Sequence, residues 1–304
     1  MKGIILAGGF GTRLHPLTTV TSKQLLPVYD KPMVYYPLSV LMQAGIREIL
    51  VISRPEHLDG FRTLLGDGSA LGLRLDFAVQ SAPRGLADAL LVGREFIGDQ
   101  RVCLILGDNI FHGPELPLVL EEEVNKLDGC TLFGYPVPDP ERYGVAVLDA
   151  RGALVDLEEK PAVPDGDLAV TGLYLYDNEA VGYAAELTPS ARGELEITDL
   201  NRRFLAEGRA RLVHLGPGTA WLDTGTPDSL LEAGAFVQMF EKRQGTRIAC
   251  LEEVAYRMGF VPADGMRELI RAAGPQTPKG RYLTRLLDSS ELPLPARDVR
   301  TARR

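Results

Sequence analysis

The order of short apolar runs in the first third of the chain limits most strongly what it can fold into. Runs rich in β-forming residues occupy 2–8 (KGIILAG), 47–53 (REILVIS), 73–79 (LRLDFAV) and 101–107 (RVCLILG). Between them, 32–45 and 85–98 show helical periodicity, and each ends on a glycine. Nearly continuous apolar strands suit a parallel sheet that is covered on both faces. This order predicts a doubly wound, Rossmann-like α/β fold with right-handed crossovers.

The pattern becomes less regular after about residue 130. Residues 143–161 resemble a hairpin with DARG as its turn, and 168–177 and 209–216 read as further strands. Residues 226–245 predict a long amphipathic helix, and helical patterns follow. We therefore expect a mostly parallel mixed sheet flanked by helices, with a β-rich insertion and a helical C-terminal extension. The expected division is a core over 1–240, an extension over 241–287 and a mobile tail over 288–304.

Composition limits the partners that such a chain can take. Its 304 residues include 33 Lys and Arg against 41 Asp and Glu, a net charge of −8. General nucleic-acid binders usually carry a basic surface, so we expect no nucleic-acid partner. The initial apolar run, MKGIILAGG, is too short for a signal peptide, and no stretch is long enough to span a membrane. These features predict a cytoplasmic enzyme without a membrane partner.

The cysteines and histidines do not indicate a metal centre of their own. Cys103, Cys130 and Cys250 stand singly in apolar segments, with no CxxC pair among them. Buried, reduced thiols are therefore expected. The histidines show no spacing of the zinc-binding type.

A glycine-rich turn follows the first expected strand. It contains, in order, Gly8, Gly9, Gly11, Thr12 and Arg13. The turn does not match G-x-G-x-x-G, because Leu14 stands where the third glycine would be, and Lys23 is not placed as in a P-loop. Glycines let backbone N–H groups approach phosphate oxygens, and Arg13 and Lys23 can neutralise part of a triphosphate. The turn predicts a phosphate site; the alternative is a plain tight turn with two solvated cations.

Two aspartates follow apolar strands and are candidate metal ligands. Asp108 comes directly after the strand at 101–107, at the carboxyl end where open α/β sheets bind ligands. Asp223 lies between an aromatic-led strand and a Thr-Gly-Thr turn, too early to cap the helix that Thr226 or Asp228 would begin. Two carboxylates with water and phosphate oxygens would satisfy Mg²⁺. For Asp108, a turn or cap role is the alternative.

A third candidate lies in DLEEKPAVP, residues 156–164. Because Lys160 precedes Pro161, we expect an extended backbone that projects the lysine from the strand end. Glu159 can accept hydrogen bonds from hydroxyl groups. A charged, solvent-facing loop is the alternative.

The order of these segments resembles that of the sugar nucleotidyltransferases, most closely those that transfer a thymidylyl group. The similarity covers about residues 1–287. It is carried by KGIILAGG, SKQLLPVYDKPM, LGDN, DPERYGV, EEKP, RGELEITD and WLDTGT, in this order. The resemblance implies a nucleotidyltransferase fold in which the β-rich insertion binds the sugar.

The resemblance also implies a role for each matching residue. The nucleotide would be bound by Gly8, Gly9, Gly11, Thr12, Arg13, Lys23, Gln24, Gln80, Gly85 and Asp108, with Gln80 reading the pyrimidine edge. The sugar phosphate would be bound by Asn109, Gly144, Glu159, Lys160, Val170 and Arg192. Asp108 and Asp223 would hold Mg²⁺, and Arg13, Lys23 and Lys160 would carry the catalysis.

The reaction implied is the attack of glucose 1-phosphate on the α-phosphorus of dTTP, which yields dTDP-glucose and pyrophosphate. The chemistry requires no protein nucleophile. Cations offset the repulsion between the two anions and stabilise the leaving group. The product would supply dTDP-rhamnose and deoxysugar synthesis.

The resemblance further implies a homotetramer with a second, regulatory nucleotide-sugar site between subunits, at which dTDP-rhamnose would inhibit. His112, Gly113, Glu253 and Arg257 match that site. Glu253 and Arg257 are four residues apart on an expected helix, so an ordinary surface ion pair is the alternative.

The chain departs from the family pattern at several positions. Phe10 replaces a serine in the glycine turn, and Asp88 stands where glutamine is usual. Pro227 replaces a histidine, which suits the first turn of a helix. Gln43 and Pro117 depart from the usual regulatory residues, which leaves feedback inhibition open.

Other functions remain as alternatives from the sequence. The chain could use UTP or other hexose 1-phosphates, because one glutamine senses a 5-methyl group weakly. A regulatory subunit that binds nucleotide sugars without turnover is another alternative, although the charged candidates are all present. A dehydrogenase is disfavoured by the missing G-x-G-x-x-G pattern.

Overall fold

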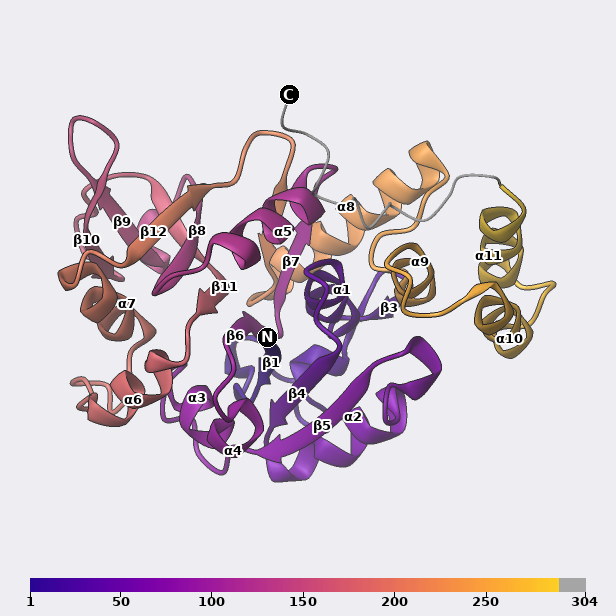
Figure 1. Ribbon diagram of the computed structural model, residues 1–304, viewed down its shortest axis with the longest axis horizontal. Coiled ribbons are helices and arrows are strands. Elements are labelled where there is room, and N and C mark those ends of the chain that lie inside the picture. Colours follow the sequence, from indigo (N-terminus) through magenta and orange to yellow (C-terminus); the bar gives the residue numbers. More distant parts are fainter. Residues whose placement is uncertain (290–304) are drawn as a thin grey trace.

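The structure is a computed structural model that describes residues 1–289 (Figure 1). Most of the tail expected over 288–304 therefore lies outside the described residues. The strands are β1 (Lys2–Ala7), β2 (Pro27–Val28), β3 (Lys31–Pro32), β4 (Glu48–Ser53), β5 (Arg74–Val79), β6 (Val102–Leu106), β7 (Asn109–His112), β8 (Cys130–Pro136), β9 (Gly144–Leu148), β10 (Leu154–Glu159), β11 (Leu168–Tyr176), β12 (Ala210–His214) and β13 (Ala220–Asp223). The helices are α1 (Tyr35–Gln43), α2 (Leu58–Leu65), α3 (Asp88–Val92), α4 (Arg94–Ile97), α5 (Leu116–Lys126), α6 (Glu179–Glu186), α7 (Ile197–Ala206), α8 (Pro227–Gln244), α9 (Leu251–Arg257), α10 (Ala263–Ala273) and α11 (Pro278–Asp288).

The main sheet is mixed, as the sequence predicts. Its strand order is β10-β9-β11-β6-β1-β4-β5, and β8 joins β11 to β12. The strands β6, β1, β4 and β5 run parallel to one another, whereas β11 runs antiparallel to β6. Because β1 and β6 lie side by side, the loops at their carboxyl ends meet at one edge of the sheet. This edge is where ligands bind in open α/β sheets.

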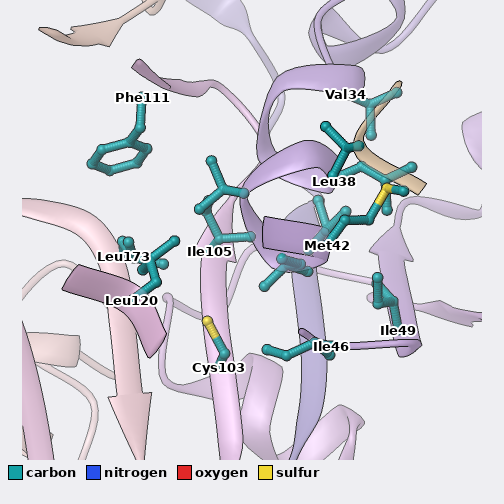
Figure 2. Close-up of a cluster of buried hydrophobic side chains, with 14 of the residues drawn as sticks. Val34, Leu38, Met42, Ile46, Ile49, Cys103, Ile105, Phe111, Leu120 and Leu173 are labelled. Carbon is teal, nitrogen blue, oxygen red and sulfur yellow. The ribbon is translucent and has the colours of Figure 1, made fainter. Parts of the chain in front are cut away.

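Alternate residues of the central strands pack into separate clusters on the two faces. Ile5 and Ile105 belong to a cluster with residues of α1, whereas Ile4 and Leu104 belong to a cluster with residues of α3. Figure 2 shows Val34, Leu38 and Met42, from α1 and the residue before it, near Ile105, Cys103 and Ile49. Both faces are thus covered, which explains why these strands read as continuous apolar runs. Each side chain so buried stabilises the fold by about 1.5–3 kcal/mol.

The β-rich insertion forms the other end of the sheet. The strands β9 and β10 pair antiparallel around the DARG turn, which confirms the predicted hairpin. In Figure 1 they lie at the opposite end of the molecule from α10 and α11. The hairpin places residues 144 and 159 opposite each other at its open end, next to β11.

One expectation for a helix needs correction. The helix expected over 85–98 is divided into α3 and α4 at Gly93, where an added Cβ would lie 2.8 Å from Ile4 Cδ1. The expected boundary between 240 and 241 falls inside α8, which continues to Gln244. Leu251 and Val254 of α9 belong to the same cluster as Ile5, so this helix packs with the core. The expected division of the chain into a core and an extension stays a prediction.

The start of α8 follows the expected capping chemistry. Thr226 is the N-cap, and its hydroxyl accepts a hydrogen bond from the Ser229 N–H at 3.2 Å. The Ser229 hydroxyl accepts in return from the Thr226 N–H at 3.0 Å. Pro227 occupies the first helical position, where its missing N–H costs no hydrogen bond. The cap fixes the point at which the chain leaves Asp223.

Candidate active site

A cavity of about 580 Å³ opens at the carboxyl ends of β1 and β6. Among the residues predicted from the sequence, its wall contains Gly9, Arg13, Asp108, Asn109, Gly144, Glu159, Lys160, Val170, Arg192 and Asp223. These residues come from segments far apart in the chain, namely the glycine turn, the two aspartate loops, the β9–β10 hairpin and the segment before α7. The structure thus brings the six predicted sugar-phosphate residues and three of the ten predicted nucleotide residues to one space.

The glycine turn presents its backbone to this space. The N–H groups of residues 8–13 donate no hydrogen bond to any other residue that the structure describes. Gly11 has a φ of 61°, which favours glycine, and its carbonyl accepts from the Thr18 hydroxyl at 2.9 Å. A run of unpaired N–H groups after a strand is a ready site for phosphate oxygens.

Phe10, which the family pattern does not predict, has a partner outside the turn. Its side chain is half-exposed, and the Arg54 guanidinium lies 4.1 Å from the centre of its ring. Arg54 directly follows β4 and also pairs with Glu56. This cation–π contact joins the tip of the glycine turn to the neighbouring strand.

The two aspartates are brought together by a short two-stranded ladder. The strands β7 and β13 pair antiparallel, with Asp223 opposite Asn109, the residue after Asp108. The Thr224 N–H and hydroxyl both donate to the Asp108 carbonyl oxygen, at 3.2 Å and 2.7 Å. Trp221 Nε1 donates to Asn109 Oδ1 at 2.7 Å, and the Gly172 N–H donates to the same oxygen at 3.0 Å. Both aspartate loops are therefore held by hydrogen bonds to the sheet.

The surroundings of the two aspartates shift the pKa values of their carboxyl groups in opposite directions. Burial alone would raise the pKa of Asp108, but the charge of Lys23 and hydrogen bonds from Lys23 and Asn109 lower it. Lys23 Nζ forms an ion pair with Asp108 Oδ2, and the Asn109 amide donates to Asp108 Oδ1 at 3.1 Å. Burial and the charge of Asp108 raise the pKa of Asp223. The aspartates thus repel each other, and the surrounding cations offset only part of this repulsion.

Arg13 and Arg142 supply further positive charge on the Asp223 side. Arg142 Nη2 lies 3.5 Å from Asp223 Oδ2. The guanidinium of Arg13 lies against Gly225, where an added Cβ would meet its Nη2 at 2.9 Å. Both charges act to lower the pKa of Asp223. A larger residue at position 225 would displace Arg13 from the cavity.

The carboxylate of Glu159 is held at the opposite wall. It accepts from the Thr198 hydroxyl at 2.6 Å and from Arg192 Nη2 at 3.1 Å. Lys160 Nζ lies 3.4 Å from the same carboxylate. Arg192 also donates to Glu196, from Nε at 3.1 Å and from Nη2 at 2.7 Å. These bonds fix an acceptor and two cations where the hairpin meets the segment before α7.

The expected extended backbone at Lys160 is wrong. Its φ is 45°, in the left-handed region that non-glycine residues rarely adopt. The Lys160 N–H donates to the Tyr143 carbonyl at 3.0 Å, a bond that turns the chain at the end of β10. Lys160 therefore reaches the cavity from a sharp turn, and such strain is often found at functional sites.

The predicted nucleotide residues Gly8, Gln24, Gln80 and Gly85 are not part of the wall of this cavity. Gln24 is buried against Gly107, and its Oε1 accepts from the Ser22 hydroxyl at 2.5 Å. Gln80, at the end of β5, lies so close to Gly8 that an added Cβ there would meet its Oε1 at 2.5 Å. Gly85 has a φ of 102°, and an added Cβ would clash with the Leu195 carbonyl oxygen. Gly8 and Gly85 thus permit the close approach of the Gln80 side chain and of the Leu195 backbone, respectively.

Comparison with known proteins identifies the family. The model of the nucleotidyl transferase family matches residues 2–239. The chain belongs to this family. It is 55% identical over 287 residues to the glucose-1-phosphate thymidylyltransferase of Neisseria meningitidis serogroup A, a match that covers 94% of this chain and 99% of that one. The Mycobacterium tuberculosis protein of the same name is 50% identical over 288 residues, covering 95% and 99% of the two chains.

Solved structures agree with the nucleotidyl transferase assignment. A Bacillus anthracis protein assigned provisionally to glucose-1-phosphate thymidylyltransferase, crystallised with sucrose, matches with a TM-score of 0.72 and 44% identity. That match covers 78% of this chain and 94% of the other. A UDP-glucose pyrophosphorylase crystallised with UDP-glucose, at 24% identity and a TM-score of 0.68, shares the fold, with 80% of this chain and 99% of that chain covered.

The candidate site includes residues for which no role is predicted from the sequence. Arg142, Tyr143, Trp221 and Thr198 all line the cavity. Arg142 and Tyr143 lie within DPERYGV, and Thr198 lies within RGELEITD, so the motifs that carry the resemblance could have pointed to them. Their roles depend on side-chain contacts between distant segments, which spacing alone does not give.

The four residues predicted for regulation come from two places, His112 and Gly113 at the end of β7 and Glu253 and Arg257 on α9. The His112 ring packs edge-on against Phe240, at 4.3 Å between centres, and burial lowers its pKa. An added Cβ at Gly113 would meet the Gly218 carbonyl oxygen at 2.9 Å. Glu253 accepts from Arg257 Nε at 2.8 Å, the expected ion pair within α9. The regulatory site stays a prediction.

The metal-binding capacity of the site rests on two carboxylates. Within residues 1–289, no group of three or more His, Cys, Asp or Glu side chains could hold a metal ion. Asp108 and Asp223 would supply oxygen ligands, and their mutual repulsion would be relieved by a divalent cation. A pair of carboxylates completed by water and phosphate fits Mg²⁺, which is commonly bound in this way.

Among residues 1–289, no helix is long and apolar enough to cross a membrane.

Proposed function

We propose that this chain is a Mg²⁺-dependent glucose-1-phosphate thymidylyltransferase. It transfers a thymidylyl group from dTTP to α-D-glucose 1-phosphate and releases pyrophosphate, with dTDP-glucose as the product. The observation that carries the proposal is the shared cavity, in which the glycine turn and aspartates face the Glu159–Lys160 turn. The names of relatives with 50–55% identity over nearly the whole chain support it.

The glycine turn and its cations bind the triphosphate. Unpaired N–H groups of residues 8–13 donate to phosphate oxygens, and Arg13 adds a planar, charged donor. Lys23, paired here with Asp108, keeps that carboxylate ionised and supplies a second positive charge. These groups neutralise dTTP and hold its α-phosphorus in position for attack.

The opposite wall binds glucose 1-phosphate. Glu159 accepts hydrogen bonds from sugar hydroxyls, and the Lys160 ammonium pairs with the sugar phosphate. Arg192 fixes Glu159 through its own bonds to Glu159 and Glu196, with Asn109, Gly144 and Val170 completing this wall. Holding two anions at a set distance removes much of the entropic and electrostatic barrier to their reaction.

The reaction is an in-line displacement between the two substrates. A phosphate oxygen of glucose 1-phosphate bonds to the α-phosphorus, while the bond from that phosphorus to the bridging oxygen of pyrophosphate breaks. The electron pair leaves on pyrophosphate, so no covalent enzyme intermediate forms. Asp108 and Asp223 would hold Mg²⁺, which shields phosphate charge when it is bound. Arg13, Lys23 and Lys160 stabilise the charge that shifts toward the leaving group.

Regulation is part of the proposal. We infer a homotetramer that dTDP-rhamnose inhibits by binding a second nucleotide-sugar site at His112, Gly113, Glu253 and Arg257. The ion pair of Glu253 with Arg257 supports a defined geometry on α9. With Gln43 and Pro117 at two of the usual positions, inhibition is expected to be weaker than in the family pattern.

Pyrophosphate release from dTTP and glucose 1-phosphate tests the proposed function. Turnover should require both substrates, stop on chelation with EDTA and return with Mg²⁺. Adding dTDP-rhamnose tests the regulatory site in the same assay. Faster turnover with UTP than with dTTP would favour the uridylyl alternative. Tight binding of dTDP-glucose without any pyrophosphate release would favour a regulatory subunit instead.

A further inference from the structure

Gln80 has a hydrogen-bond partner that the family pattern does not predict. Its amide nitrogen donates to Asp88 Oδ2 at 2.8 Å. Both side chains are buried, Gln80 to 4% exposure and Asp88 to 1%. The contact therefore joins the residue predicted to read the base to Asp88, a position at which the chain departs from the family pattern.

Arg84 holds the other oxygen of the same carboxylate. Its Nε and Nη2 donate to Asp88 Oδ1 at 3.1 Å and 2.6 Å. With one oxygen engaged by Arg84 and the other by Gln80, the carboxylate is fixed in orientation. Asp88 is the first residue of α3, but these bonds point its side chain at Gln80 and Arg84 rather than at the helix N–H groups.

A carboxylate fixes which end of the Gln80 amide turns toward it. An ionised aspartate accepts hydrogen bonds and cannot donate them, so it must face the NH₂ group of the glutamine. The Gln80 oxygen is therefore turned away from Asp88. This assignment follows from donor chemistry, which decides amide orientation more firmly than atom positions do.

The Gln80 oxygen faces the glycine turn and lacks a donor. It lies next to Gly8, where an added Cβ would meet it at 2.5 Å. Within residues 1–289, no hydrogen bond to this oxygen is formed. Gln80 is only 4% exposed, so a ligand that enters beside the glycine turn can supply the donor that this oxygen lacks. Its place beside the glycine turn makes the nucleotide the natural donor.

We propose that Asp88 is a positioning residue that sets nucleobase specificity through Gln80. By holding the NH₂ group of Gln80, it presents a fixed acceptor to the base. That acceptor selects a pyrimidine with an N3–H donor, thymine or uracil, and rejects cytosine, whose N3 is itself an acceptor. The inference rests on the proposed function and adds the cause of its base selection.

Replacing Asp88 by asparagine tests this assignment with little change in shape. In D88N the charged Arg84 would keep the oxygen of the new side-chain amide, so the NH₂ group of that amide would face Gln80. The Gln80 amide would then turn over and present its own NH₂ group to the base. We expect the ratio of kcat/KM for dTTP to that for dCTP to fall by about tenfold or more. The kcat with saturating dTTP should change little, because Asp88 does not touch the reacting atoms.

A reciprocal double variant provides the rescue. In Q80E/D88N, the NH₂ group introduced by D88N donates to the carboxylate introduced by Q80E, whose other oxygen is again an acceptor toward the base. We expect this variant to recover preference for dTTP over dCTP, whereas Q80E alone sets two carboxylates against each other and loses dTTP binding. Asp59→Asn, at an aspartate whose side chain is 91% exposed, is the matched control.

The outcomes separate this inference from the proposed function. An unchanged dTTP-to-dCTP ratio in D88N, or no recovery in Q80E/D88N, would overturn the role of Asp88 while dTTP turnover by the unaltered chain still stands. Absence of that turnover would instead contradict the proposed function. Should D88N fail to fold, Asp88→Ala gives the same readout, because it removes the acceptor that orients the Gln80 amide and leaves Arg84, 63% exposed at its side chain, free to turn toward solvent.

Discussion

Asp223 lies opposite Asn109, the residue after Asp108, in the β7–β13 ladder, and burial together with the charge on Asp108 raises the pKa of Asp223. Lys23 pairs with Asp108 and keeps the pKa of that carboxyl low. The fold therefore holds together two like charges, one paired with Lys23 and the other with Arg142 at 3.5 Å. Such repulsion costs stability and is expected where a cation is to be bound.

Exchange of either aspartate for asparagine should separate stability from activity. Asp223→Asn removes the repulsion, so its thermal unfolding midpoint should equal or exceed that of the unaltered chain. Asp108→Asn leaves the nearly buried Lys23 without its partner and should unfold at a lower temperature. Both should lower kcat by about 100-fold or more, since each removes a proposed ligand of Mg²⁺. Asp264→Asn, 92% exposed at its side chain, is the control; a destabilised Asp223→Asn would contradict the repulsion.

Removal of the Phe10 ring should weaken dTTP binding without slowing chemistry. In Phe10→Leu the contact with Arg54 is lost and the glycine turn is less well held. An exposed cation–π contact contributes about 0.5–1 kcal/mol, which corresponds to a rise of about two- to fivefold in KM for dTTP. Phe10→Tyr should retain the KM, and Val20→Ala, at an 88% exposed valine, serves as the control. A lower kcat at unchanged KM would argue against this role.

Hydrophobic pattern predicted the central sheet well because burial there is continuous. The strands β1, β4, β5 and β6 lie within one residue of their expected bounds. The helix expected over 85–98 is broken because Gly93 packs against Ile4, a long-range contact that periodicity does not encode. Periodicity also does not encode the pairing of β13 with β7, because β7 lies more than 100 residues earlier in the chain.

The candidate site was predictable by residue type but not by detailed contact. Motifs placed Asp108, Asp223 and Glu159 on separate strand ends, and the topology then brought them to one cavity. The backbone of Lys160 was mispredicted because its N–H bond to Tyr143 outweighs the local preference set by Pro161. The Gln80–Asp88 bond joins a strand end to a helix start, and no local rule predicts it.

The cysteines should be unreactive in the folded protein. Burial raises the pKa of Cys130 and Cys250 to about 12 and that of Cys103 still further. Because the thiolate is the reactive form, iodoacetamide at pH 7.5 should leave all three thiols unmodified while the chain is folded. Mass spectrometry should show three adducts once guanidinium chloride is present. Rapid labelling of a thiol in the folded chain would show that its segment opens locally.

Lys160 allows a direct test of strain held for function. Both Lys160→Ala and Lys160→Gly remove the ammonium group and should lower kcat/KM for glucose 1-phosphate to a similar extent. Their stabilities should differ, because alanine at a φ of 45° keeps the strain of the left-handed region whereas glycine does not. The glycine variant should be more stable than the alanine variant by about 1 kcal/mol in denaturant unfolding. The exposed Lys126, paired with Glu122 on α5, is the control for loss of a lysine, and Lys126→Ala should keep full activity. Equal stabilities for the two Lys160 variants would mean that the turn relaxes once its side chain is shortened, and the strain would then belong to the lysine itself.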